Sequence, residues 1–220
     1  MAVAIIVFES ELFMLLAKPW CVNLLIFVPV VCLYSWRRER LGIAWKTLFV
    51  AAAFAAAFGF VEAACVDYLR GNVPAVQQSS FAAADITNPE AVHVLPDSLL
   101  KTEMMREAAT MIMLLAIPFL GATKVRERWA LFLWCFAIWD VVYYLGLWAT
   151  IHWPTSLRDL DVLFLIPKPW YSEVWYPIVV SGATMAAVLI GCSGVMAKRM
   201  ALKAAAARTV FSTLTESSHP

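Results

Sequence analysis

The stretch TLFVAAAFAAAFGFVEAACV, residues 47–66, decides the fold of this chain. It contains a single charged residue, Glu62. The hydrocarbon core of a bilayer is about 30 Å thick, and about 20 mostly apolar helical residues cross it. This stretch therefore predicts a membrane-spanning helix, which we expect over residues 45–68.

Small residues recur every fourth position along that helix, at Ala51, Ala55, Gly59 and Ala63. Such a ladder lets the backbone of another helix approach closely. Glu62 follows Gly59 by three residues, so it borders the ladder and faces protein rather than lipid. The pattern predicts that this span packs against a second helix.

The composition of the whole chain agrees with a membrane protein. The 220 residues are 62% hydrophobic and 15% charged, with a mean hydropathy of +0.75. A water-soluble domain of ordinary composition is far more polar. The five cysteines stand singly in apolar stretches, which is typical of small buried residues. We expect the lipid bilayer as a partner and no nucleic acid.

The sequence predicts an all-α polytopic membrane helix bundle. A single transmembrane domain covers residues 1–197, and a basic, Ala-rich tail covers residues 198–220. We expect the amino-terminal residues 2–17, which carry two acids, to form an interfacial helix. A re-entrant or interfacial segment, with a short helix after Ser156, is expected at 155–170. The five predicted spans are residues 20–36, 45–68, 102–123, 129–150 and 175–197.

Basic residues set the expected orientation. They gather between the first two spans, between the third and fourth spans, and after the fifth span. With five spans all three groups fall on one side, which the positive-inside rule makes cytoplasmic. The loops at 71–101 and 151–174 then face the external side. The longer of them, 71–101, has two equal interpretations, a lid over a site or a solvated connector.

Three acidic residues lie inside predicted spans, namely Glu62, Glu107 and Asp140. A charge near a bilayer centre costs about 2.5–3.5 kcal/mol on insertion scales, so such residues are functional by default. At 1.5 Å per residue, Glu62 and Glu107 lie about 9 Å below the external boundary and Asp140 about 15 Å. We expect the three carboxylates to share one pocket that opens externally, where Tyr143 and Tyr144 orient them.

Further residues of the same half are candidates for holding a substrate. Two arginines near the mouth could pair with an anionic headgroup or diphosphate, and the others are polar or aromatic. Carboxylates and other oxygens could instead hold a divalent metal, so a metal cofactor is left open. The candidate substrate-binding residues are Arg70, Arg106, Trp139, His152, Asp161 and Trp170.

Each of these features also has a structural explanation. Glu107 lies near a helix amino terminus, where the helix dipole favours negative charge. Asp140 could hydrogen-bond within the bundle and simply hold helices together. The aromatic residues of this half are also what an interfacial aromatic belt contains.

Several motifs together resemble an uncharacterised family of small polytopic membrane proteins from bacteria. The motifs are GFVEAACVDYLR (59–70), REAATMIML (106–114), FAIWDVVYY (136–144), WPTSL (153–157) and DVLFLIPKPW (161–170). They cover the middle of the chain, about residues 59–170. The resemblance implies no activity. It implies only a bacterial membrane setting. Together with the predicted spans and the basic loops, it leads us to expect a multi-pass protein of the bacterial cytoplasmic membrane.

These observations favour a membrane-embedded enzyme that uses Glu62, Glu107 and Asp140 on a lipophilic lipid, isoprenoid or quinone-like substrate. One alternative is a non-catalytic subunit of a larger membrane complex, in which the small-residue ladders dock other subunits. A second alternative is a proton-coupled transporter, although the sequence has no inverted repeat or paired broken helices.

Overall fold

The computed structural model describes residues 16–38, 40–72 and 97–193. Five helices in this part of the chain are long and apolar enough to cross a membrane: Trp20–Arg37, Trp45–Leu69, Leu99–Gly121, Val125–Ile151 and Trp175–Ser193. The expectation of an all-α polytopic bundle is confirmed, and the five helices are compatible with a multi-pass membrane protein. Of the helix expected at 2–17, only residues 16 and 17 are among the described residues. The tail expected at 198–220 lies outside them.

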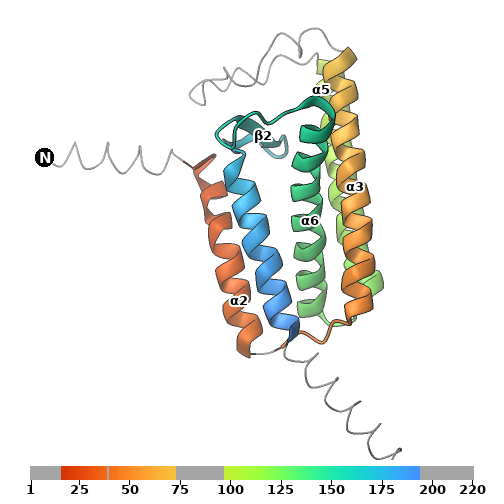
Figure 1. Ribbon diagram of the computed structural model, residues 1–220, viewed down its shortest axis with the longest axis vertical. Coiled ribbons are helices and arrows are strands. Elements are labelled where there is room, and N and C mark those ends of the chain that lie inside the picture. Colours follow the sequence, from red (N-terminus) through yellow and green to blue (C-terminus); the bar gives the residue numbers. More distant parts are fainter. Residues whose placement is uncertain (1–15, 39, 73–96, 194–220) are drawn as a thin grey trace, which may run out of the picture.

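The helices form two groups that stand side by side (Figure 1). One group pairs α2 with the C-terminal helix, and the other contains α3, α5 and α6. The described helical elements are η1 (Trp20–Phe27), α2 (Val28–Arg38), α3 (Trp45–Asn72), α5 (Asp97–Gly121), α6 (Val125–Ile151) and the C-terminal helix (Trp175–Ser193).

The first span changes its winding at Pro29. A proline has no N–H, so Pro29 cannot donate to the Leu25 carbonyl as an α-helix would require. The chain before it is a 3₁₀-helix, η1, and the N–H of Val28 donates to the Leu25 carbonyl instead. The carbonyl oxygen of Leu25 is thus satisfied where the proline interrupts the α-helical pattern.

The basic connection between α2 and α3, the basic connection between α5 and α6, and the end of the C-terminal helix meet at one end of the bundle. The N–H of Gly42 donates to Glu127 Oε1 at 3.1 Å, and the Arg126 guanidinium donates to the Arg40 carbonyl at 3.2 Å. The N–H of Leu41 donates to the carbonyl of Gly191 at 3.1 Å. We call this end, formed by residues 40–44, 124–128 and 190–193, the basic end.

The small-residue ladder of α3 packs against α6. A Cβ placed on Gly59 would lie 2.5 Å from the backbone oxygen of Trp139, and one on Gly146 would lie 2.7 Å from Cβ of Ala63. Ala55 and Ala63 are fully buried. The expected close helix partner is therefore found within the chain itself.

Replacing Gly59 with alanine is expected to destabilise the bundle, because backbone atoms cannot move aside as a flexible side chain can. Overpacking of this kind costs about 1–3 kcal/mol. Gly182→Ala is the matched control, since its Cβ would meet nothing within 4 Å and alanine favours helix by up to about 1 kcal/mol. Thermal unfolding in detergent should show a lower Tm for Gly59→Ala only. Equal Tm values for both variants would contradict the close α3–α6 packing.

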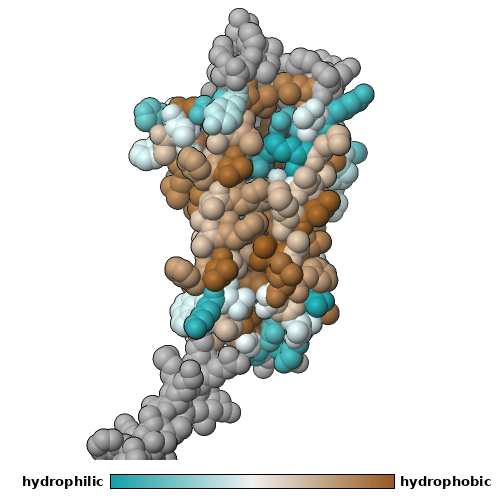
Figure 2. Space-filling view, turned by 90° about the vertical axis from the view of Figure 1, so that its right-hand side faces the viewer, coloured by the Kyte–Doolittle hydropathy of each residue, from teal (hydrophilic) through white to brown (hydrophobic). Residues whose placement is uncertain are grey.

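Apolar packing and polar groups occupy different parts of the bundle. The main core, which includes Trp36, Leu41, Leu48 and Leu131, lies toward the basic end. Buried acids and hydroxyls lie toward the opposite end, at Glu62, Glu107, Thr110, Asp140, Asp161 and Ser181. Figure 2 shows an apolar band around the middle, with hydrophilic residues reaching into its upper part on one face. We call the end that contains these buried acids and hydroxyls the polar end. A functional site can form there.

A small antiparallel sheet caps the polar end beside α6 (Figure 1). Its strands are β1 (Ala17–Lys18), β2 (Leu160–Phe164) and β3 (Trp170–Glu173), in the order β1-β3-β2. Ser172 in the central strand faces Asp161 on one side and Ala17 on the other. We call β2, β3 and the loop between them the hairpin.

The prediction of a short helix after Ser156 is wrong. Asp159 does collect hydrogen bonds as a capping acid would, because its Oδ2 accepts the N–H groups of Thr155 and Ser156 at 2.7 and 3.1 Å. The chain closes a turn there and then enters β2 instead of a helix. Pairing with β3 satisfies the backbone of Leu160–Phe164, and a local cap alone does not decide between the two structures.

Candidate functional site

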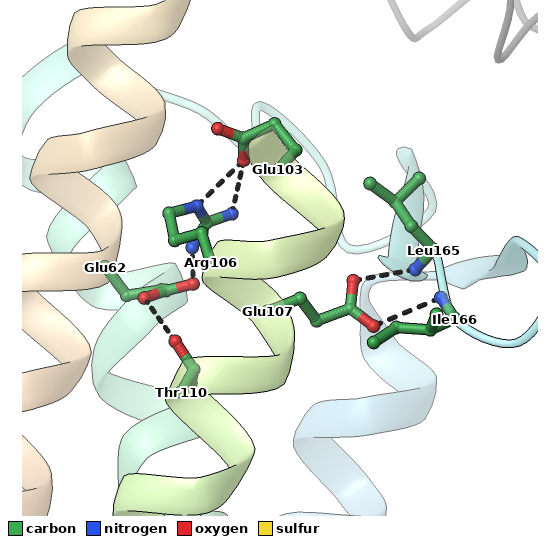
Figure 3. A network of polar contacts seen from close by, with 7 residues as sticks. All are labelled: Glu62, Glu103, Arg106, Glu107, Thr110, Leu165 and Ile166. Atoms are coloured by element: carbon green, nitrogen blue, oxygen red, sulfur yellow. Dashed lines mark hydrogen bonds and ion pairs between the residues drawn. The ribbon is translucent and has the colours of Figure 1, made fainter. Parts of the chain in front are cut away.

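The first polar group joins α3 to α5 through Arg106. Its guanidinium forms an ion pair with Glu62 Oε1, and its Nε and Nη2 lie 2.8 and 2.6 Å from Glu103 Oε2 (Figure 3). Thr110 donates to the other oxygen of Glu62 at 3.2 Å. Both oxygens of this buried carboxylate are therefore bound, and the one cation serves two acids.

The second polar group holds the hairpin against α5. Glu107 Oε2 accepts the N–H of Leu165 at 2.8 Å, and Oε1 accepts the N–H of Ile166 at 3.2 Å (Figure 3). Glu107 lies about 12 Å along α5 from Leu99, where the apolar segment begins. Non-helical backbone at such depth needs acceptors supplied by protein. Glu107 supplies two of them.

The third polar group lies between α6, the hairpin and the C-terminal helix. Ser181 donates to Asp140 Oδ2 at 2.7 Å, and Tyr144 donates to Asp161 Oδ2 at 2.9 Å. The two carboxyl groups are 8% and 7% exposed and lie within electrostatic range of one another. We call these four residues the Asp140–Asp161 site.

Aromatic rings form a column along α6 beside this site. Trp139 stacks on Tyr143 with centroids 6.2 Å apart and contacts Phe136 at 5.5 Å. Phe136 in turn stacks on Phe164 of the hairpin at 6.1 Å. We call Phe132, Phe136, Trp139 and Tyr143 the aromatic column, and only Trp139 among them is fully buried.

The remaining predicted residues lie apart from these groups. Trp170 packs edge-on against Phe164 in the hairpin. His152 is exposed and ends α6 in a left-handed conformation, with φ of 55°. Arg70 belongs to the last turns of α3, and its side chain lies outside the described residues. Burial raises the pKa of Tyr171, whose hydroxyl lies in the hairpin.

The three predicted acids share the polar end but bind different partners. Glu62 pairs with Arg106, Glu107 binds the hairpin backbone, and Asp140 binds Ser181. The rings of Tyr143 and Tyr144 contact each other with centroids 5.1 Å apart, but Tyr143 also stacks on Trp139 whereas Tyr144 binds Asp161.

Sequence reasoning missed Ser181. The sequence signal for this residue is a serine in an otherwise apolar span, three residues before Thr184. In the structure both side chains are buried. Polar side chains inside a transmembrane helix commonly hydrogen-bond to another helix. That rule would have included Ser181 as a partner for an intramembrane acid.

Among residues 16–38, 40–72 and 97–193, no group of three or more His, Cys, Asp or Glu side chains could hold a metal ion. No protein-family model, curated protein or solved structure matches the chain.

Proposed function

We propose that this chain is a membrane-embedded enzyme that performs acid–base chemistry on a lipophilic substrate at the Asp140–Asp161 site. The observation that carries the proposal is the presence of two buried carboxyl groups from different elements in one part of the bundle, each bound by a hydroxyl and within electrostatic range of the other. Asp140 comes from α6 and Asp161 from the hairpin.

The other two intramembrane acids are fully used in structure. Glu62 is bound by a cation and a hydroxyl, and both oxygens of Glu107 are bound by backbone N–H groups. Asp140, by contrast, has no cationic partner among the described residues. Keeping an acid without a counter-charge in an apolar environment opposes folding, which favours a functional reason for its presence.

Two carboxyl groups within electrostatic range of one another in a buried site are not both ionised at low cost, because like charges repel strongly where water is excluded. Such a pair can provide a general acid and a general base in one site. In this proposal Asp161 and Asp140 exchange a proton with the substrate. Ser181 and Tyr144 orient the two carboxyl groups through their hydroxyl hydrogens.

The proposal includes an orientation in the bacterial cytoplasmic membrane. Two basic segments, residues 37–46 and 124–128, meet at the basic end, and the positive-inside rule assigns that end to the cytoplasm. The hairpin and the Asp140–Asp161 site then open toward the external side. A membrane-impermeant maleimide applied to spheroplasts should label a Lys168→Cys variant, and labelling only in inverted vesicles would contradict this orientation.

The catalytic proposal is tested by lipid analysis of the organism that carries the gene. In a deletion strain, one lipid-soluble compound should accumulate, and the wild-type gene should remove it. Asp140→Asn and Asp161→Asn keep the size of each side chain but lose the proton, so turnover should fall by about 10²–10⁴-fold. Asp67→Asn, the same change on α3 outside the site, is the matched control.

The protein level and monodispersity of each variant are measured alongside the lipids. Accumulation of the compound with well-folded Asn variants supports the catalytic role. A wild-type lipid profile restored by both Asn variants would contradict it. The subunit alternative is weakened by the packing of Ala55, Gly59 and Ala63 inside the chain, because this ladder is not free to dock another protein.

A further inference from the structure

The indole N–H of Trp139 is a buried donor that has no acceptor among the described residues. The side chain is 7% exposed. Two other tryptophan donors are satisfied, because Trp134 donates to the Leu48 carbonyl at 3.0 Å and Trp175 donates to Glu173 at 2.6 Å. A buried donor left unpaired costs about 1–3 kcal/mol. Its retention points to an acceptor that the described residues do not supply.

The surroundings of Trp139 define the kind of ligand that can carry this acceptor. The indole belongs to the aromatic column, in which Phe132, Phe136 and Tyr143 are only half-buried. Phe136 of the column stacks on Phe164 of the hairpin, and Asp140, which follows Trp139 in the chain, ties α6 to the C-terminal helix. The column therefore lies against the hairpin, within the long apolar helix α6.

The charge of the ligand follows from the neighbouring groups. An indole N–H is a neutral donor, and neutral donors pair well with carbonyl oxygens, whereas a phosphate is better served by a cation. The nearest cation to consider is Arg106, which is within electrostatic range of Tyr143. Arg106 is already bound by Glu62 and Glu103, so an anionic ligand would have to displace a carboxylate.

We propose that Trp139 donates its indole N–H to the carbonyl oxygen of a lipophilic ligand whose apolar part lies along the aromatic column. The carbonyl can come from the ring of an isoprenoid quinone or from the acyl ester of a phospholipid. The inference rests on the proposed function only in treating this ligand as the substrate of the adjoining Asp140–Asp161 site.

The experiment observes the indole N–H resonances of the full chain in lipid nanodiscs by ¹⁵N–¹H spectroscopy. The spectrum of Trp139→Phe, which keeps an aromatic ring but lacks the donor, identifies the Trp139 resonance. Decyl-ubiquinone is titrated into nanodiscs made of ether-linked lipids, which contain no ester carbonyl. In a second arm, ether-linked lipids are replaced by their ester-linked counterparts without added quinone.

A saturable shift of the Trp139 resonance with decyl-ubiquinone assigns the ligand to the quinones, and Trp139→Phe should weaken binding about tenfold. A shift between ether- and ester-linked lipids alone assigns it to phospholipid esters. The Trp134 resonance, whose donor is already bound to Leu48, should stay fixed in both arms. A Trp139 resonance that moves in neither arm overturns the inference. Binding is measured without turnover, so Asp140→Asn protein that binds the ligand and also retains full turnover would contradict only the catalytic role.

Discussion

Replacing Arg106 with leucine is expected to lower the free energy of unfolding by about 3–5 kcal/mol, because removing one partner of a buried ion pair leaves an uncompensated charge. Glu62 would lose its cation while only Thr110 still binds it, and Glu103 would lose its partner as well. The Arg106 and Glu62 side chains are 28% and 9% exposed, so water can replace the lost interaction only in part. Unfolding in mixed detergent micelles measures the change.

A double-mutant cycle separates this ion pair from other effects of the substitution. Glu62→Gln removes the charge that Arg106 balances, so the Arg106→Leu/Glu62→Gln variant should be more stable than Arg106→Leu alone. Lys101→Leu is the matched control, since it removes an exposed cation from the same helix. Additive effects of the two substitutions would show that Arg106 and Glu62 do not act as a pair.

The two ion pairs of Arg106 differ in whether they can be predicted from the sequence. The pairing of Glu103 with Arg106, three residues apart on one helix, follows from helix geometry alone. The pairing of Arg106 with Glu62 does not, because it depends on the rotation of α5 relative to α3. The sequence predicts that Glu62 faces protein and lies in the external half. It does not say which helix provides the partner.

The same distinction, between local features that the sequence predicts and contacts between distant segments that it does not, holds for the bundle as a whole. Hydropathy predicts the spans because each one is a local property of about 20 residues. The three-stranded sheet was not predicted, since β1 and β3 lie more than 150 residues apart in the chain and each is too short to carry a strand pattern. The polar contacts of Glu107 and Asp161 depend on where this hairpin docks. For that reason their partners could not be predicted from the sequence.

The structure separates the intramembrane acids by the kind of partner they have. An acid bound by a cation or by two backbone donors stabilises the fold, and its removal should lower stability. An acid bound by a hydroxyl, within electrostatic range of another acid, does little for stability that an amide could not do. Loss of stability at Arg106 or Glu107 and loss of turnover at Asp140 or Asp161 are therefore distinguishable results.

Replacing Glu107 with alanine is expected to release the hairpin from α5. The N–H groups of Leu165 and Ile166 would lose their acceptors, at about 1–3 kcal/mol for each donor left unpaired. The release is measured in spheroplasts through the rate at which a Lys168→Cys variant reacts with the impermeant maleimide, with Tm measured in parallel. Wild-type protein gives the background from the native cysteines.

The labelling rate should rise and Tm should fall for Glu107→Ala, whereas Met105→Ala on the lipid-exposed side of the same helix should change neither. Glu107→Gln should fall between them, because an amide keeps one acceptor oxygen and places an NH₂ donor against the second backbone N–H. Asp161 belongs to the hairpin, so its contact with Tyr144 should weaken when the hairpin is released. Unchanged labelling and Tm in Glu107→Ala would mean that other contacts hold the hairpin. The Asp140–Asp161 site would then be assembled independently of α5.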